Sequence, residues 1–344
     1  MSSKKILKKV LTDRALIEEQ FNKVFEEGPL YSSQELTIIS GHKLVEEGLT
    51  IKNLKSLGIQ ASMVARAAEL WQSLHKEGYH ITMSITSNIV SSGLREIILE
   101  LIRLKLIDSL IATTGAFEED IIKEKFDYHL IDFKIESKKL PVGHSRIGNM
   151  LVSNKGYIYF YKLIEKWFKE SSFLTKESLW QFFKKTLKDS KTIFNIALEN
   201  RVYYRIPYIL DGSLGDCLYF LSEIRDKRPL IDDFKDHRDF LRYLRQFKKK
   251  AVIFIGGGLS KHYNANSHLL TGGADAAIYI TSATYKDASD SGGDAEEAKS
   301  WNKIDLNSRT IELFGEATIV LGLIFLLLKE ENKNNAPRIQ QAKE

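Results

Sequence analysis

The sequence contains few residues that cross-link or kink a chain. Its 344 residues include one cysteine and five prolines. The single cysteine, Cys217, excludes an internal disulfide and fits a reducing compartment, so we expect a cytoplasmic protein. Cys217 follows Asp216 within an apolar run, which favours a buried structural thiol over a nucleophile. The low proline and glycine content indicates that most of the chain is folded.

Neither charge nor hydrophobicity indicates a nucleic-acid or membrane partner. The formal net charge of +5 results from 50 basic and 45 acidic residues spread along the chain, whereas a nucleic-acid-binding face needs clustered Lys and Arg. The nearly apolar run 317–328 is too short to span a bilayer and is typical of a buried helix. No long apolar stretch follows the N-terminal lysines, so no signal peptide is expected.

Short apolar runs alternate with amphipathic stretches along the chain. Because these runs are continuous, they predict strands that are buried on both faces, at residues 81–86, 109–113, 206–210, 251–255 and 276–280. A helix is expected to open near Glu118. Continuous apolar strands separated by helices indicate an α/β fold with a mainly parallel sheet covered by helices on both faces.

Small and polar residues gather directly after four of the predicted strands. These loops are Thr86–Gly93, Thr113–Gly115, Asp211–Asp216 and Gly256–Gly258. In open α/β sheets ligands bind at the carboxyl ends of strands, where glycine permits close approach and helix N-termini favour phosphate. Each loop alone also has a structural explanation, since a triple glycine is more often a tight turn. Together the four loops predict a dinucleotide site.

Lys303 lies beside Trp301 and downstream of four carboxylates, a combination that suits imine chemistry on a polyamine. A lysine attacks only when neutral, and its free pKa of about 10.4 leaves little neutral amine at pH 7. If residues 296–303 form a helix, Lys299 lies one turn before Lys303 and would disfavour its protonation. We therefore predict that Lys303 is a nucleophile assisted by Lys299.

Six segments, in this order along the chain, resemble the deoxyhypusine synthase family. They are residues 86–96, 118–120, 147–152, 211–216, 256–266 and 289–303, and they cover roughly residues 40 to 330. The resemblance implies Rossmann-like, doubly wound subunits that bind NAD. It also implies a homotetramer with active sites between paired subunits.

The reaction implied by the resemblance begins with spermidine, which loses a hydride to NAD. The aminobutyl group then passes to Lys303 as an imine, and 1,3-diaminopropane leaves. The group is transferred to a lysine of the translation factor 5A precursor, where the new imine is reduced to deoxyhypusine.

Site residues carry over from the family position by position. The positions that match its NAD site are Ser87, Asn88, Ser91, Thr113, Gly115, Glu119, Asp211, Gly257, Ser282, Ala283, Asp287 and Ala317. Those that match its polyamine site are Asp216, Asn266, Asp290, Glu297 and Trp301, with Glu119 shared between the two sites. Lys303, His262 and Glu119 are the predicted catalytic residues, and His262 is the best candidate for moving protons.

The sequence departs from the family pattern at three places. Tyr263 follows His262 where the family often has a second histidine, and Asn302 replaces the glycine that commonly precedes the lysine. Glu316 precedes Ala317 where the family favours aspartate, and its longer side chain would still reach a ribose hydroxyl.

Two other functions would use nearly the same residues. A homospermidine synthase-like enzyme would use putrescine as the acceptor in place of a protein lysine. A non-catalytic NAD-binding paralogue is the other, although the joint presence of Lys303, Trp301, His262 and Glu119 argues against it. The expected organisation is an N-terminal helical arm (1–40), a catalytic domain (41–329) and a polar C-terminal tail (330–344).

Overall fold

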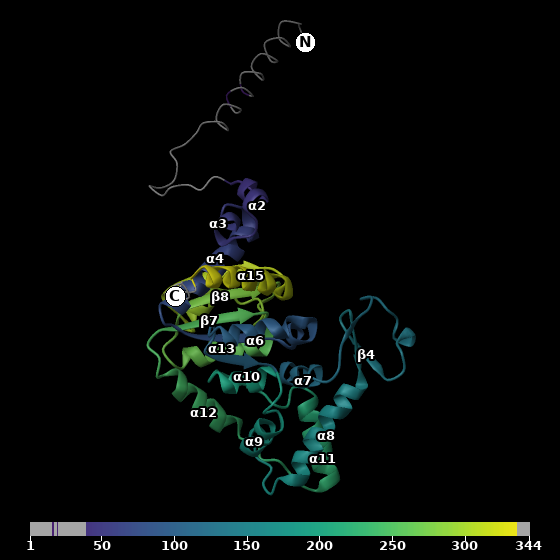
Figure 1. Ribbon diagram of the computed structural model, residues 1–344. Coiled ribbons are helices and arrows are strands. Elements are labelled where there is room, and N and C mark those ends of the chain that lie inside the picture. Colours follow the sequence, from purple (N-terminus) through teal and green to yellow (C-terminus); the bar gives the residue numbers. More distant parts are fainter. Residues whose placement is uncertain (1–15, 17–18, 20–38, 336–344) are drawn as a thin grey trace, which may run out of the picture. The chain divides into compact units, whose positions relative to one another are not determined.

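The computed structural model describes residues 16, 19 and 39–335 (Figure 1). Most of the predicted N-terminal arm, and residues 336–344 of the predicted tail, lie outside the described residues. The last described helix, α15 (Ala317–Asn335), continues past the point where the tail was expected to begin.

Six parallel strands form the central sheet, in the order β6-β2-β1-β7-β8-β9. Their bounds are β1 His80–Ile85, β2 Ser109–Ala112, β6 Tyr203–Arg205, β7 Lys250–Ile255, β8 Ala274–Thr281 and β9 Ile304–Phe314. Strands β1, β2 and β7 are buried along their whole length, as their continuous apolar sequences predict. The predicted parallel α/β architecture is confirmed.

Two details of the sheet differ from the prediction. The third strand is Tyr203–Arg205, whereas residues 206–210 form a bend and a turn. Pro207 accounts for this error, because proline has no N–H to donate to a neighbouring strand. Strand β9 was not predicted, since this edge strand is mostly exposed and its sequence lacks a continuous apolar run.

Helices cover both faces of the sheet, so the doubly wound arrangement is confirmed. On one face lie α4 (Ile59–Lys76), α6 (Arg95–Arg103) and α15, which enclose the largest hydrophobic cluster. On the other lie α12 (Asp233–Leu244), α13 (Gly258–Leu269) and α14 (Ala295–Ser300). Residues 317–328 lie in α15, which buries most of them as expected, whereas Ile319 and Leu326 are exposed. No helix among the described residues is long and apolar enough to cross a membrane.

A second, aromatic-rich cluster lies beyond the β6 edge. Phe117, Phe160, Trp167 and Phe183 are its largest members. It is built from α7 Thr114–Lys123, α8 Asn154–Glu170, α9 Lys176–Thr186, α10 Ile193–Glu199 and α11 Ser213–Arg225. Between α7 and α8 the chain forms a small antiparallel sheet of β3 His129–Leu130, β4 His144–Ile147 and β5 Met150–Ser153. Within residues 39–335, the other α-helices are α2 His42–Glu47, α3 Ile51–Lys55 and α5 Ser87–Ile89.

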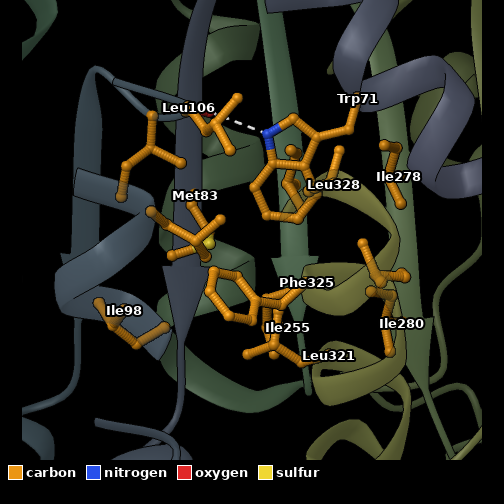
Figure 2. Close-up of a cluster of buried hydrophobic side chains, with 14 of the residues drawn as sticks. Trp71, Met83, Ile98, Leu106, Ile255, Ile278, Ile280, Leu321, Phe325 and Leu328 are labelled. Carbon is orange, nitrogen blue, oxygen red and sulfur yellow. Dashed lines mark hydrogen bonds between the residues drawn. The ribbon is translucent and has the colours of Figure 1, made fainter. Parts of the chain in front are cut away.

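Trp71 of α4 anchors the largest cluster. Its ring is fully buried among side chains of the sheet and α15, and its indole N–H donates to the Leu106 carbonyl at 2.9 Å (Figure 2). This bond ties α4 to the loop that leads into β2.

We predict that Trp71→Phe lowers the free energy of unfolding by about 2–4 kcal/mol, because it leaves a void and removes the donor to Leu106. Urea denaturation measures this loss. The control Trp301→Phe changes a ring that is 60% exposed, so its midpoint should stay close to that of the unmodified protein. Equal effects at both positions would contradict the assignment.

Candidate functional site

The predicted cofactor residues follow the six parallel strands, whose carboxyl ends share one edge of the sheet. In the order of the strands from β6 to β9, they are Asp211; Thr113 and Gly115; Ser87, Asn88 and Ser91; Gly257; Ser282, Ala283 and Asp287; and Ala317. Glu119 lies on α7, the helix that follows β2. The structure therefore brings loops that are far apart in the sequence to a common edge.

Glycines let these loops approach one another closely. A Cβ atom at Gly257 would lie 2.5 Å from the Cβ of Ser291, so a larger residue would separate the loops after β7 and β8. The Gly258 amide donates to Ser291 Oγ at 2.9 Å. On the other side of β1, a Cβ at Gly115 would lie 3.2 Å from that of Ser87.

This edge fits the phosphates of a dinucleotide. Helix α13 begins at Gly258, and its N-cap residue, Gly257, offers no side chain to the first amide groups. The first N–H groups of a helix have no intrahelical acceptor and favour an anion. Ser291 Oγ accepts from the Gly258 amide alone, so the close-packed glycines and the next amides of the helix start together fit the phosphates of such a cofactor.

Lys303 lies in a narrow slot on the face of β8 and β9, next to α13 and α14. The lining residues are Lys261, His262, Ala265, Tyr279, Asp290, Gly293, Asp294, Glu297, Ala298 and Lys303. The structure thus brings together Lys303, His262, Asp290 and Glu297, as the sequence predicts. His262 Nε2 is 3.0 Å from Asn266 Nδ2 and 3.5 Å from Asp290 Oδ1.

Trp301, two residues before Lys303, is exposed and is not among the residues that line the slot. The Lys303 Nζ atom is 6.0 Å from the centroid of its ring, which is within the range of a cation–π contact. The ring remains largely exposed, so it can also cover an apolar chain that enters the slot.

The predicted helix over residues 296–303 is wrong, because α14 ends at Ser300. Asn302 adopts a left-handed conformation with φ 57°, which terminates the helix and turns the chain into β9. Glycine and asparagine adopt this conformation most readily, and this explains why Asn302 can replace the family glycine. Lys299 pairs with Glu296 at 2.6 Å and does not line the slot, so the hypothesis that it activates Lys303 loses its basis.

The slot also contains Lys261 and Tyr279, two polar side chains that sequence reasoning did not predict as site residues. Lys261 is 5% exposed and donates to the carbonyls of Ser291 (3.0 Å) and Gly293 (2.6 Å). Burial lowers its pKa to about 8. The Tyr279 hydroxyl is buried and has no hydrogen-bond partner, so it is available to a polar ligand atom. Its position next to His262 was the one feature of the sequence that could have indicated Lys261.

Three consecutive carboxylates on α7 have three different partners. Glu118 accepts from the Leu214 amide at 2.7 Å, at the start of α11. Asp120 accepts from Arg95 Nε at 2.8 Å. Glu119 accepts hydrogen bonds from Tyr128 and Tyr157. Only Glu119 was predicted as a site residue, and Glu118 instead holds the loop that carries Asp211 and Asp216.

Asp216 lines an open cavity formed with Tyr161, Cys217, Tyr219 and Phe220. Neither Asp216 nor Glu119 lines the Lys303 slot, so a single chain does not bring these predicted polyamine ligands to the lysine. Cys217 is buried, and burial raises the pKa of its thiol to about 12. This confirms the predicted structural role of the cysteine.

The structure gives physical reasons for the other two departures from the family pattern. The Tyr263 hydroxyl contacts Arg205 Nε at 3.3 Å and His237 Nδ1 at 2.9 Å, linking α13 to β6 and α12. Glu316 turns back to accept from the amides of Thr318 (3.0 Å) and Ile319 (3.1 Å) at the start of α15. Its carboxylate is therefore engaged within its own helix.

We predict that Glu118→Gln changes how stability depends on pH. Burial raises the pKa of Glu118 to about 7, so the contribution of its protonated form to stability is full below pH 4.5 and is lost as the pH rises to 7. Glutamine does not ionise. The free energy of unfolding of Glu118→Gln, relative to that of the unmodified protein, should therefore rise by up to about 3 kcal/mol between pH 4.5 and 7.

Thermal and urea unfolding at several pH values measure this gain. Glu223→Gln, at an exposed position of α11, is the control and should have little effect on the free energy of unfolding. A pH-independent difference for Glu118→Gln would contradict the expectation.

Comparison with known proteins confirms the resemblance that the sequence predicts. The model of the family described as deoxyhypusine synthase matches residues 50–327. The chain is 37% identical to the "Probable deoxyhypusine synthase" of Methanocaldococcus jannaschii, over 81% of the chain and 91% of the relative. It is 31% identical to the "Deoxyhypusine synthase" of Kluyveromyces lactis, over 92% of the chain and 94% of the relative.

A solved structure supports the same fold. The crystal structure of "a putative deoxyhypusine synthase from Entamoeba histolytica" superimposes with a TM-score of 0.57 at 21% identity. The match covers 85% of this chain and 97% of that one.

Proposed function

Since the chain belongs to the deoxyhypusine synthase family, we propose that it transfers the aminobutyl group of spermidine, through an imine on Lys303, to a lysine of the translation factor 5A precursor. The other product is 1,3-diaminopropane. The observation that carries this proposal is the slot that places the Lys303 amine with His262, Asp290 and Glu297. Membership of this family supports an enzyme, specifically a transferase.

The row of loops at the carboxyl edge is the place where NAD would bind. Gly257 and the start of α13 would hold its phosphates, and Ser87, Asn88 and Thr113 would hold other parts of the cofactor. NAD, when bound, supplies the hydride acceptor for oxidation of the amine and the hydride donor for the final reduction. The contact between Gly257 and Ser291 joins this edge to the loop above the slot.

The slot suits a linear polyamine. The Asp290 and Glu297 carboxylates can hold ammonium groups, and the free Tyr279 hydroxyl can accept from an N–H. Trp301 can cover the methylene chain. The slot and Trp301 can therefore bind both the ammonium groups and the methylene chain of a polyamine.

His262 is placed to move the protons that the transfer requires. Lys303 Nζ must lose a proton before it attacks the carbon from which hydride has left. The departing nitrogen of 1,3-diaminopropane must gain one. His262 lies in the same slot, and its Nε2 atom is close to both Asp290 and Asn266. It can take up the first proton and return it to the leaving amine.

We also propose that the enzyme acts in the cytoplasm as a homotetramer, with residues 41–329 as its catalytic domain. Asp216 and Glu119 do not line the Lys303 slot of their own chain. The aromatic rings of Tyr219 and Phe220 are more than half exposed beside Asp216, as expected of a surface that another copy covers. A second copy that packs there would add its Asp216 and Glu119 to the slot.

We predict that Lys303→Arg lowers aminobutyl transfer at least about 1000-fold, because no imine can form on the arginine. The purified protein is incubated with NAD and spermidine, and the adduct is located by mass spectrometry. Lys299→Arg is the matched control, since Lys299 lies outside the slot, and it should keep nearly full activity.

The acceptor is identified in the same experiment by adding either the 5A precursor or putrescine. A labelled precursor protein supports the proposed function. Transfer to putrescine alone would instead identify a homospermidine synthase-like enzyme. Full activity of Lys303→Arg, or an adduct on another lysine, would overturn the assignment of Lys303.

A further inference from the structure

Glu119 is buried, and each of its two carboxylate oxygens accepts a hydrogen bond from a tyrosine. Only 4% of the residue is exposed. Tyr157, in the first turns of α8, donates to Oε1 at 2.6 Å. Tyr128, in the segment between α7 and β3, donates to Oε2. Two elements that follow α7 in the chain thus converge on one carboxylate.

No cation pairs directly with Glu119 among residues 39–335. The charged and titratable groups nearest to it are Glu118 on the same helix, Lys123 one turn later, Tyr128 and Tyr157. The Lys123 Nζ atom lies 4.5 Å from the centre of the Tyr128 ring and donates instead to the Ser91 carbonyl at 3.0 Å. The negative charge of Glu119 is therefore held by two neutral donors.

This arrangement is stable because a buried carboxylate needs hydrogen bonds when it lacks an ion pair. Burial, together with the neighbouring Glu119, raises the pKa of both tyrosine hydroxyls. Tyr128 and Tyr157 consequently remain protonated donors at any physiological pH. They cannot become competing anions beside Glu119.

The two tyrosines leave part of the carboxylate free. Each carboxylate oxygen has two lone pairs, and each tyrosine occupies one of them. The remaining lone pairs can accept N–H groups, so the matching ligand is an amine or ammonium group. An anion would be repelled by the charge of Glu119.

We propose that Tyr128 and Tyr157 are positioning residues that hold Glu119 as a fixed, charged carboxylate for an amine of the substrate. This inference rests on the proposed function, because it assumes that Glu119 faces a polyamine. Lys123 connects Tyr128 to Ser91, in the segment where the cofactor is expected. The position of the Glu119 carboxylate is thus fixed by residues that lie outside α7, the helix that carries it.

The test compares Tyr128→Phe, Tyr157→Phe and the double variant with Tyr159→Phe. Tyr159 lies two residues from Tyr157 on α8, and its ring packs against Phe126 without contacting Glu119. The kcat/KM for spermidine is measured from pH 6 to 10 with saturating NAD. Calorimetry measures spermidine binding over the same range, and thermal unfolding reports stability.

Each single variant should lower kcat/KM about tenfold, and the double variant about 100-fold, as expected for lost hydrogen bonds to a charged group. The acid limb of the profile should move to higher pH, because a carboxylate with fewer donors takes up a proton more readily. Tyr159→Phe should change neither quantity. In a Glu119→Gln background, Tyr128→Phe should lower kcat/KM less than about twofold further, since the charge that the Tyr128 hydroxyl stabilises is absent.

An unchanged pH profile, with only a lower unfolding temperature, would overturn the inference and leave the tyrosines a purely structural role. The binding measurement needs no turnover. If the unmodified protein binds spermidine without transferring it, the proposed function fails. In that case the pH dependence of spermidine binding in the variants still decides whether the tyrosines position Glu119.

Discussion

The candidate site depends on the contact between two loops that follow neighbouring strands. Gly257 after β7 and Ser291 after β8 approach so closely that a Cβ at position 257 would collide with the serine. The Gly258 amide and the Lys261 ammonium both hold the second loop in place. Gly257 belongs to the edge where the predicted cofactor residues gather, and the loop of Ser291 also carries Asp290 and Gly293, which line the slot that contains Lys303. The close packing of Gly257 against Ser291 therefore joins this edge to the slot.

The three adjacent carboxylates of α7 show that the surroundings of a residue give similar side chains different partners and different pKa values. Burial raises the pKa of Glu118 to about 7 and that of Asp120 to about 6, and Asp120 also pairs with Arg95. Glu119 meets two hydroxyl donors instead. Nothing in the sequence Glu-Glu-Asp distinguishes these roles, because each depends on an element that is distant in the chain. The fold gives one carboxylate a backbone amide, one an ion pair and one a pair of tyrosine hydroxyls.

The buried strands and the loops after them could be predicted from the sequence, because continuous apolar runs are specific to a sheet covered on both faces. Strand β9 could not, since an edge strand needs no apolar run. The error at residues 206–210 came from weighing hydrophobicity above Pro207. The predicted slot residues Lys303, His262, Asp290 and Glu297 do lie together. Lys261 and Tyr279 were missed because a buried amine and a free hydroxyl are recognised only from their surroundings.

The left-handed turn at Asn302 limits how this part of the protein can evolve. A β-branched or bulky side chain there would strain the backbone that carries Lys303 out of α14 and into β9. Natural variation at this position should be confined to glycine, asparagine and aspartate. The turn that directs Lys303 from α14 into β9 thus restricts the identity of the residue before it.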